Sequence, residues 1–322
     1  MNLLFIADPL ESFKIYKDTT FVMLREAARR GHALSVCEPK DIMWQSGGAV
    51  TAFVRDMTLT GNPDTWFIAA QAAPHEKPVA IKDFGAVVMR KDPPFDSEYF
   101  YATHLLQQAE REGARVFNKP AALRNHPEKL AILEFSQYCS PTLVTRDASD
   151  IKRFYAEHKD IILKPLDGMG GTGIFRVREQ ADGAPDPNLN VVIETLLKDG
   201  AQTCMVQRFL PAISQGDKRV LVIGGKPVSH CLARIPQGGE TRGNLAAGGK
   251  GVAQPLGPRD REIAEALGPV LAARGLLLVG LDIIGDCLTE INVTSPTCFQ
   301  EITQQAGVDV PALFLDALEA AL

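Results

Sequence analysis

Residues 162–177 read ILKPLDGMGGTGIFRV, an apolar run with one lysine followed by four glycines. Residues 168–173 match the dinucleotide-binding pattern G-x-G-x-x-G, which requires a strand before the glycines and a helix after them. A strand is expected at 160–165, but residues 174–179 alternate apolar and charged side chains, as a second strand does. The glycines are therefore predicted to join a hairpin. Such a hairpin can bring backbone N–H groups close to a phosphate, although the same residues also suit an ordinary flexible turn.

The composition is that of a globular protein without a membrane span. The 322 residues are 45% hydrophobic and 23% charged, with a net charge of −5. Residues 1–8 lack a basic leader and are predicted to form a first core strand, so we expect a cytoplasmic protein. The six cysteines are dispersed without zinc-type spacing, and the lack of Lys/Arg runs argues against nucleic acid as a partner.

Three blocks are predicted along the chain. In residues 1–120 strands alternate with helices, which indicates a parallel sheet covered by helices. Ligands of such sheets lie at the carboxyl ends of the strands, where residues 8–9 and 89–96 are expected. Residues 121–209, with the glycine hairpin, and residues 210–322 are both predicted to be α+β units, so the fold class is α/β with α+β.

A possible metal site is formed by Asp282, Glu290 and Asn292. Residues 277–284 and 288–293 are predicted to pair as a hairpin, with Glu290 and Asn292 on one face and Asp282 opposite them. Oxygen ligands without nearby histidine or cysteine suit Mg²⁺, which takes its other ligands from water and phosphate. A solvated polar face is the alternative explanation.

The longest glycine-rich segment is residues 235–251, with six glycines, Arg242 and Lys250. A loop of this length is usually a functional lid or a disordered linker. Lys129, Lys164, Arg219 and Arg234 are further cations near these motifs. Each alone could be a surface charge, but a lysine inside the apolar strand 160–165 is expected to face a phosphate. A protein kinase is excluded, because residues 83–85 (DFG) precede the glycines and no H-R-D motif is present.

The order of these segments resembles the ATP-grasp superfamily, and six motifs resemble the bacterial glutathione synthetase family almost end to end. They are MRKDPPFD (89–96), NKPAALRN (118–125), ILKPLDGMGG (162–171), GDKRVLV (216–222), CLARIPQGGETRGNLAAGG (231–249) and VGLDIIGDCLTEINVTSPT (279–297). The resemblance implies an ATP-grasp fold with an N-terminal pre-ATP-grasp domain (1–120), a lid domain (121–209) and a C-terminal domain (210–322) that carries the metal hairpin and loop 235–251.

The resemblance also implies an activity. Such an enzyme uses ATP and Mg²⁺, or Mn²⁺ in its place, to join γ-glutamylcysteine to glycine through an acyl phosphate, releasing glutathione, ADP and phosphate. Family membership further implies a homo-oligomer, a dimer or a tetramer. Another ATP-grasp carboxylate–amine ligase, of the dipeptide or D-alanine type, and a non-catalytic ATP-binding module remain as alternatives.

Site residues follow from the same resemblance. For ATP binding it implies Lys129, Lys164, Gly168, Gly170, Gly171, Gln207, Arg208, Phe209, Leu210 and Asp217. For catalysis it implies Arg219, Arg234 and Arg242, and for metal binding Asp282, Glu290 and Asn292. For the dipeptide it implies Arg90, Asn292, Ser295, Pro296 and Thr297.

Overall fold

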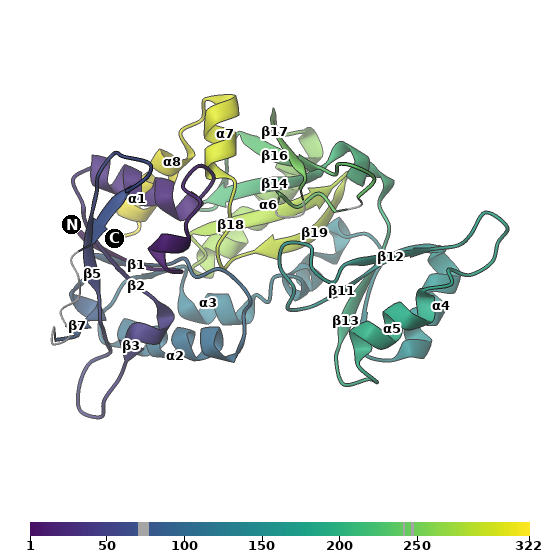
Figure 1. Cartoon of the computed structure of the whole chain (residues 1–322), viewed down its shortest axis with the longest axis horizontal. Coiled ribbons are helices and arrows are strands. Elements are labelled where there is room, and N and C mark those ends of the chain that lie inside the picture. The colour runs from purple at the N-terminus through teal and green to yellow at the C-terminus, as the bar shows by residue number, and fades with distance from the viewer. Residues whose placement is uncertain (70–76, 241, 246–247) are drawn as a thin grey trace.

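The chain folds into three units, each built around a β-sheet. The computed structural model describes residues 1–69, 77–240, 242–245 and 248–322. The first and third units lie side by side, and the central unit projects from them (Figure 1). Among the described helices, none is both long and apolar enough to cross a membrane.

The first sheet contains the predicted parallel strands and two strands that were not predicted. Its order is β6-β5-β2-β1-β8-β9, in which β2, β1, β8 and β9 run parallel and β5 and β6 are antiparallel at one edge. The elements of this unit are β1 (Asn2–Ile6), α1 (Thr19–Arg29), β2 (Ala33–Cys37), β5 (Arg55–Leu59), β6 (Phe67–Ala69), β8 (Ala86–Met89), α2 (Ser97–Arg111) and β9 (Val116–Phe117). A separate small sheet joins β3 (Ile42–Met43), β4 (Thr51–Ala52) and β7 (Val79–Ala80).

The central unit is an antiparallel sheet of order β10-β13-β11-β12, and two helices pack on it. Its elements are β10 (Thr142–Thr145), α4 (Ala148–His158), β11 (Asp160–Pro165), β12 (Phe175–Arg178), α5 (Leu189–Leu197) and β13 (Cys204–Arg208). Strands β11 and β12 pair with Leu163 opposite Phe175, so the predicted glycine hairpin is confirmed. A core of its own, built from residues between 151 and 206, holds this unit together.

The third unit is an antiparallel sheet of order β17-β16-β14-β18-β19, to which β15 adds beside β14. Its elements are β14 (Asp217–Ile223), β15 (Lys226–Pro227), β16 (His230–Ile235), β17 (Lys250–Pro255), α6 (Pro258–Ala273), β18 (Leu278–Ile284), β19 (Cys287–Asn292), α7 (Phe299–Ala306) and α8 (Val310–Ala320). The predicted β18–β19 hairpin is confirmed, with Asp282 opposite Glu290.

Short helices lie within the first unit and between the units. They are α3 (Pro120–Asn125) and the 3-10 helices η1 (Leu10–Ser12), η2 (Pro39–Asp41), η3 (Ile81–Asp83), η4 (Leu130–Tyr138) and η5 (Pro211–Gln215). Helix η4 is interrupted at Phe135 by non-helical backbone angles.

The first and third units share their hydrophobic cores. Leu4 and Val87 belong to one core with Leu281, and Phe5 belongs to a second core with Phe314. Buried Asn118 adds polar contacts, because its amide donates to the carbonyls of Leu278 and Val293 and its Oδ1 accepts from Leu278 N.

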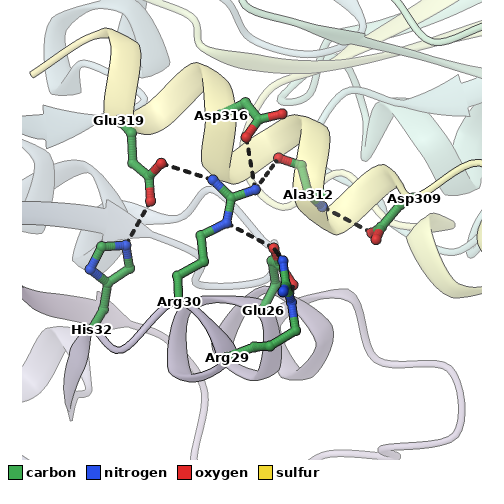
Figure 2. Close-up of polar contacts among 8 residues, drawn as sticks. All are labelled: Glu26, Arg29, Arg30, His32, Asp309, Ala312, Asp316 and Glu319. Carbon is green, nitrogen blue, oxygen red and sulfur yellow. Dashed lines mark hydrogen bonds and ion pairs between the residues drawn. The ribbon is translucent and has the colours of Figure 1, made fainter.

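A charged network joins helices α1 and α8 at the same contact (Figure 2). Arg30 lies at its centre and pairs with Glu26 of α1 and with Asp316 and Glu319 of α8, each at 2.8 Å. His32 Nε2 lies 2.7 Å from Glu319 Oε1. The two ends of the chain are therefore tied together by charge as well as by apolar packing.

Candidate functional site

A cavity of about 300 Å³ lies where the central unit faces the third sheet. The glycine hairpin, the end of β13 and the β18–β19 hairpin supply its walls. Eighteen of the twenty residues implied by the resemblance line it, namely Lys129, Lys164, Gly168, Gly170, Gly171, Gln207, Arg208, Phe209, Leu210, Asp217, Arg219, Arg234, Arg242, Asp282, Glu290, Asn292, Ser295 and Thr297. The other two, Arg90 and Pro296, lie outside its lining.

Two lysines project toward the glycine hairpin and the metal hairpin. Lys129 Nζ donates to the carbonyl of Gly168 at 2.6 Å and lies 3.1 Å from Glu290 Oε1. Lys164 Nζ donates to Thr289 O at 3.3 Å, and burial lowers the pKa of this lysine. Two nearly buried cations beside backbone carbonyls provide a place for phosphate oxygens.

The glycine hairpin contacts the long loop between β16 and β17. Residues 241, 246 and 247 of the predicted loop 235–251 lie outside the described residues. Arg242 Nη1 donates to Gly171 O at 3.1 Å. Gly171 has a φ of +84°, which favours glycine, and a Cβ there would lie 2.9 Å from Asn244 Oδ1, so a larger residue would displace that side chain.

Four buried charges alternate in sign at the floor of the cavity. Arg219 donates to both oxygens of Asp282, and Arg234 Nη2 lies 2.5 Å from Asp217 Oδ2 and 2.9 Å from Asp282 Oδ2. Burial opposes ionisation of Asp282, but Arg219 and Arg234 outweigh it and hold its pKa well below the usual range. Burial raises the pKa of Asp217 to about 6, against the opposite effect of Arg234.

The oxygen donors of the predicted metal site fit a hard divalent cation. Asp282 lies opposite Glu290, and Asn292 lies opposite Gly280 on the same strand face as Glu290. Within the described residues, no three His, Cys, Asp or Glu side chains form a group that could hold a metal. A cation here would therefore need ligands from a phosphate, as Mg²⁺ usually does.

Glu128 is a half-buried residue of the site that the sequence did not indicate. Its Oε1 accepts from Val293 N, Thr294 N and Thr294 Oγ1 at 2.8–3.0 Å, which fixes the segment that follows β19. Burial and the neighbouring charge of Glu290 raise the pKa of Glu128. A single glutamate before Lys129 carries no sequence pattern that indicates this role.

Apolar side chains form the other half of the cavity. Ile162 and Ile174 come from the glycine hairpin, and Ile213 and Ile284 come from the third unit, close to Gln207 and the residues after it. Such apolar walls suit the planar base of a nucleotide. The period-two pattern of the hairpin could have indicated Ile162 and Ile174, because both alternate with core residues.

Comparisons with known proteins agree with this geometry. The family models for the prokaryotic glutathione synthetase N-terminal and ATP-grasp domains match residues 1–124 and 128–307. A glutathione synthetase of Ralstonia nicotianae is 58% identical over 100% of this chain and 96% of its own. A glutathione synthetase of Nitrosomonas europaea is 55% identical over 99% of this chain and 98% of its own.

Solved structures show the same fold at low sequence identity. D-cycloserine synthetase DcsG has a TM-score of 0.67 and 16% identity, covering 99% of this chain and 100% of its own. The ATP-grasp ligase PsnB, complexed with minimal precursor, Mg and ADP, has a TM-score of 0.61 and 20% identity, covering 99% and 97%. These likenesses establish the ATP-grasp fold of this chain.

Proposed function

Because this chain belongs to the prokaryotic glutathione synthetase family and is an ATP-dependent ligase, we propose that the cavity described above is where it joins γ-glutamylcysteine to glycine. One observation supports this placement. Four cationic side chains and two carboxylates line the same cavity, namely Lys129, Lys164, Arg219, Arg234, Asp282 and Glu290. Such a set can neutralise a triphosphate and an activated carboxylate at once.

The reaction needs no protein nucleophile. The cysteinyl carboxylate attacks the γ-phosphorus of ATP, and ADP leaves. The amine of glycine then attacks the acyl phosphate, and phosphate leaves with one oxygen of the original carboxylate. The contribution of the protein is to position the reactants and to stabilise the charge that develops on them.

The nucleotide occupies the side of the cavity formed by the central unit. Lys129 and Lys164 bind its phosphates, and Gly168, Gly170 and Gly171 cover them. Backbone groups of residues 207–210 hold the adenine between the apolar walls. Asp217 Oδ1 is buried and has no hydrogen-bond partner among the described residues, which supports a contact with a ribose hydroxyl.

Asp282, Glu290 and Asn292 are the residues that would hold Mg²⁺, or Mn²⁺ in its place. A bound divalent cation neutralises phosphate charge during the transfer. Their oxygen donors and half-buried to buried positions support this assignment. Arg219 and Arg234 neutralise the charge of Asp282 in this structure. When a metal ion neutralises that carboxylate instead, the two arginines can bind phosphate oxygens.

The acid substrate binds at the side of the cavity that Ser295 and Thr297 line. Pro296 and Arg90 lie outside the lining and support this side. Arg219 and Arg234 stabilise the transferring phosphoryl group, and Arg242 reaches the acyl phosphate from the long loop. The contact between Arg242 and Gly171 supports closure of both glycine-rich segments over one intermediate. Closure excludes water, which would otherwise hydrolyse the acyl phosphate.

The division into domains at residues 120 and 209 stays a proposal. The separate core of the central unit supports the two boundaries around it. We also propose a cytoplasmic homo-oligomer, either a dimer or a tetramer, on the basis of family membership alone.

Isotope transfer tests the acyl phosphate. We expect γ-glutamylcysteine labelled with ¹⁸O in its cysteinyl carboxylate to deliver one ¹⁸O atom to each phosphate released during ligation. The phosphate is analysed by mass spectrometry after a single turnover. Unlabelled phosphate would exclude attack of the carboxylate on ATP.

A further inference from the structure

Strand β19 is an edge strand of the third sheet, and it carries Glu290 and Asn292 of the proposed metal site. On one side it pairs with β18, where Asn292 lies opposite Gly280. Asn292 Nδ2 donates to Gly280 O at 3.3 Å, so the amide nitrogen is engaged and the oxygen is the atom suited to a cation. The backbone N–H groups on the other side of β19 need acceptors from outside the sheet.

Glu128 supplies these acceptors. Its backbone oxygen accepts from Ile291 N at 3.0 Å, and its side-chain Oε1 accepts from Val293 N at 2.9 Å. Residues two apart in an antiparallel strand direct their N–H groups to the same side, which is why one residue can reach both. Ile291 and Val293 flank Asn292, so Glu128 holds the strand on both sides of a proposed metal ligand.

The same carboxylate oxygen also holds the chain beyond the strand. It accepts from Thr294 N at 3.0 Å and from Thr294 Oγ1 at 2.8 Å, and Thr294 is only 4% exposed. The residues that follow, Ser295 and Thr297, line the side of the cavity proposed for the acid substrate. Glu128 is therefore attached to the chain between the metal ligands and the acid-binding residues.

Lys129, the next residue, makes a further link to the same strand. Its Nζ lies 3.1 Å from Glu290 Oε1, on the strand face that also carries Asn292. Transfer of a phosphoryl group requires the attacking carboxylate and the metal-bound phosphate to be held in a fixed relation. A displacement of about 1 Å between such groups can lower the rate on the order of 100-fold.

We propose that Glu128 is a positioning residue for ligation, which fixes the place of the acid-binding segment 295–297 relative to the metal ligands of β19. The inference rests on the proposed function, which assigns the acid and the metal to these two segments. Glu128 acts through the backbone of residues 291–294. Its reach and its acceptor oxygen are therefore the properties that matter, and its charge is not.

Two variants separate reach from charge. Glu128→Gln keeps the length and an acceptor oxygen but loses the charge, whereas Glu128→Asp keeps the charge but is shorter by one methylene group. We expect kcat to fall less than about 5-fold in Glu128→Gln and on the order of 100-fold in Glu128→Asp. Glu134→Asp, half exposed on η4 and outside the cavity, is the matched control and should keep its kcat. A greater loss in Glu128→Gln than in Glu128→Asp would overturn the proposal.

Hydrogen exchange provides a readout that does not depend on activity. Mass spectrometry follows the amides of residues 290–297 in the ligand-free protein. We expect exchange on the order of 10-fold faster in Glu128→Asp and near the original rate in Glu128→Gln, because only the shorter side chain releases Val293 N and Thr294 N. Unchanged exchange in Glu128→Asp would overturn the proposal, even if its activity were low.

Calorimetry distinguishes positioning from a general structural effect. In Glu128→Asp, the Kd for γ-glutamylcysteine with Mg²⁺ and a non-hydrolysable ATP analogue should rise on the order of 10-fold, while the Kd for ATP should change less than about 3-fold. Equal weakening of both would contradict a positioning role.

Thr294→Val is the second variant if Glu128→Asp does not fold. It removes only the hydroxyl donor to Glu128 and should lower kcat about 10-fold. A normal kcat in this variant would count against the proposal. Failure of the unaltered protein to ligate γ-glutamylcysteine would instead overturn the proposed function, and the exchange experiment would still report whether Glu128 holds residues 291–294.

Discussion

Arg219 and Asp282 lie directly opposite each other on the antiparallel strands β14 and β18 and share two hydrogen bonds, of 2.6 and 3.2 Å. Both side chains are buried, and Arg234 contacts the same carboxylate. Removing one member of such a group leaves an uncompensated charge. The carboxylate proposed to bind metal and the arginines proposed to bind phosphate are thus held ready beside each other.

Metal dependence should change when Asp282 becomes neutral. We expect Asp282→Asn to raise the Mg²⁺ concentration for half-maximal ligation at least about 10-fold, because a carboxylate ligand is lost. Turnover is measured against Mg²⁺ at fixed ATP. Asp286→Asn, in the exposed turn of the same hairpin, is the matched control. An unaltered Mg²⁺ requirement in Asp282→Asn would remove this residue from the metal site.

Loss of Arg242 should separate nucleotide binding from ligation. We expect Arg242→Ala to change the Kd for ATP less than about 3-fold but to lower kcat on the order of 100-fold, because its role is at the acyl phosphate. Calorimetry measures the first quantity and product formation the second. Arg259→Ala, which removes surface contacts with Glu262, Asp286 and Tyr138 outside the cavity, should leave both unchanged. Normal turnover in Arg242→Ala would refute the role of the loop.

Asn118 should be important for stability. Its side chain makes three hydrogen bonds between the first and third units, so Asn118→Ala should lower the free energy of unfolding by about 2–3 kcal/mol. The measurement is urea unfolding. Asn125→Ala, at an exposed position on α3, should cost little. A loss no larger than that of Asn125→Ala would show that these bonds do not join the units.

Acid should weaken the charged network around Arg30 at the end of α1. Arg29 and Arg30 lower the pKa of Glu26 from 4.5 to about 2. A carboxyl group with a lowered pKa contributes stability above its unfolded pKa, and this contribution is lost as pH falls from about 4.5 to 2.

Glu26→Gln removes that contribution, on the order of 1 kcal/mol, at neutral pH. Urea midpoints at pH 7 and pH 3 measure it, and the difference between the two proteins should shrink at pH 3. Glu265→Gln on α6, with an exposed side chain, is the control. A pH-independent difference for Glu26→Gln would contradict the assignment.

The features that could be predicted from the sequence are those set by local pattern. Side chains alternate in β11 and β12 with glycines between them, and this pattern predicted the hairpin. The spacing of Asp282, Glu290 and Asn292 predicted that they lie near one another on the β18–β19 hairpin. Both patterns lie within one pair of adjacent strands, where sequence separation and side-chain direction determine position.

The features that were missed depend on tertiary contacts. Strand β6 is a three-residue edge strand, β5 carries charged residues, and the β-branched residues of α5 favour strand over helix. Glu128 becomes part of the site only because β19 ends beside it. The resemblance named Arg90, but nothing local to it shows that Thr20 and Pro296 will hold its side chain.

Phosphate release from ATP and Mg²⁺ by the purified protein tests the central claim most directly. γ-Glutamylcysteine and glycine are omitted in turn, and the product is identified by its mass. We predict that release requires both substrates and gives a product with the mass of glutathione. Release with a different acid and amine, or ATP binding without turnover, would contradict the claim.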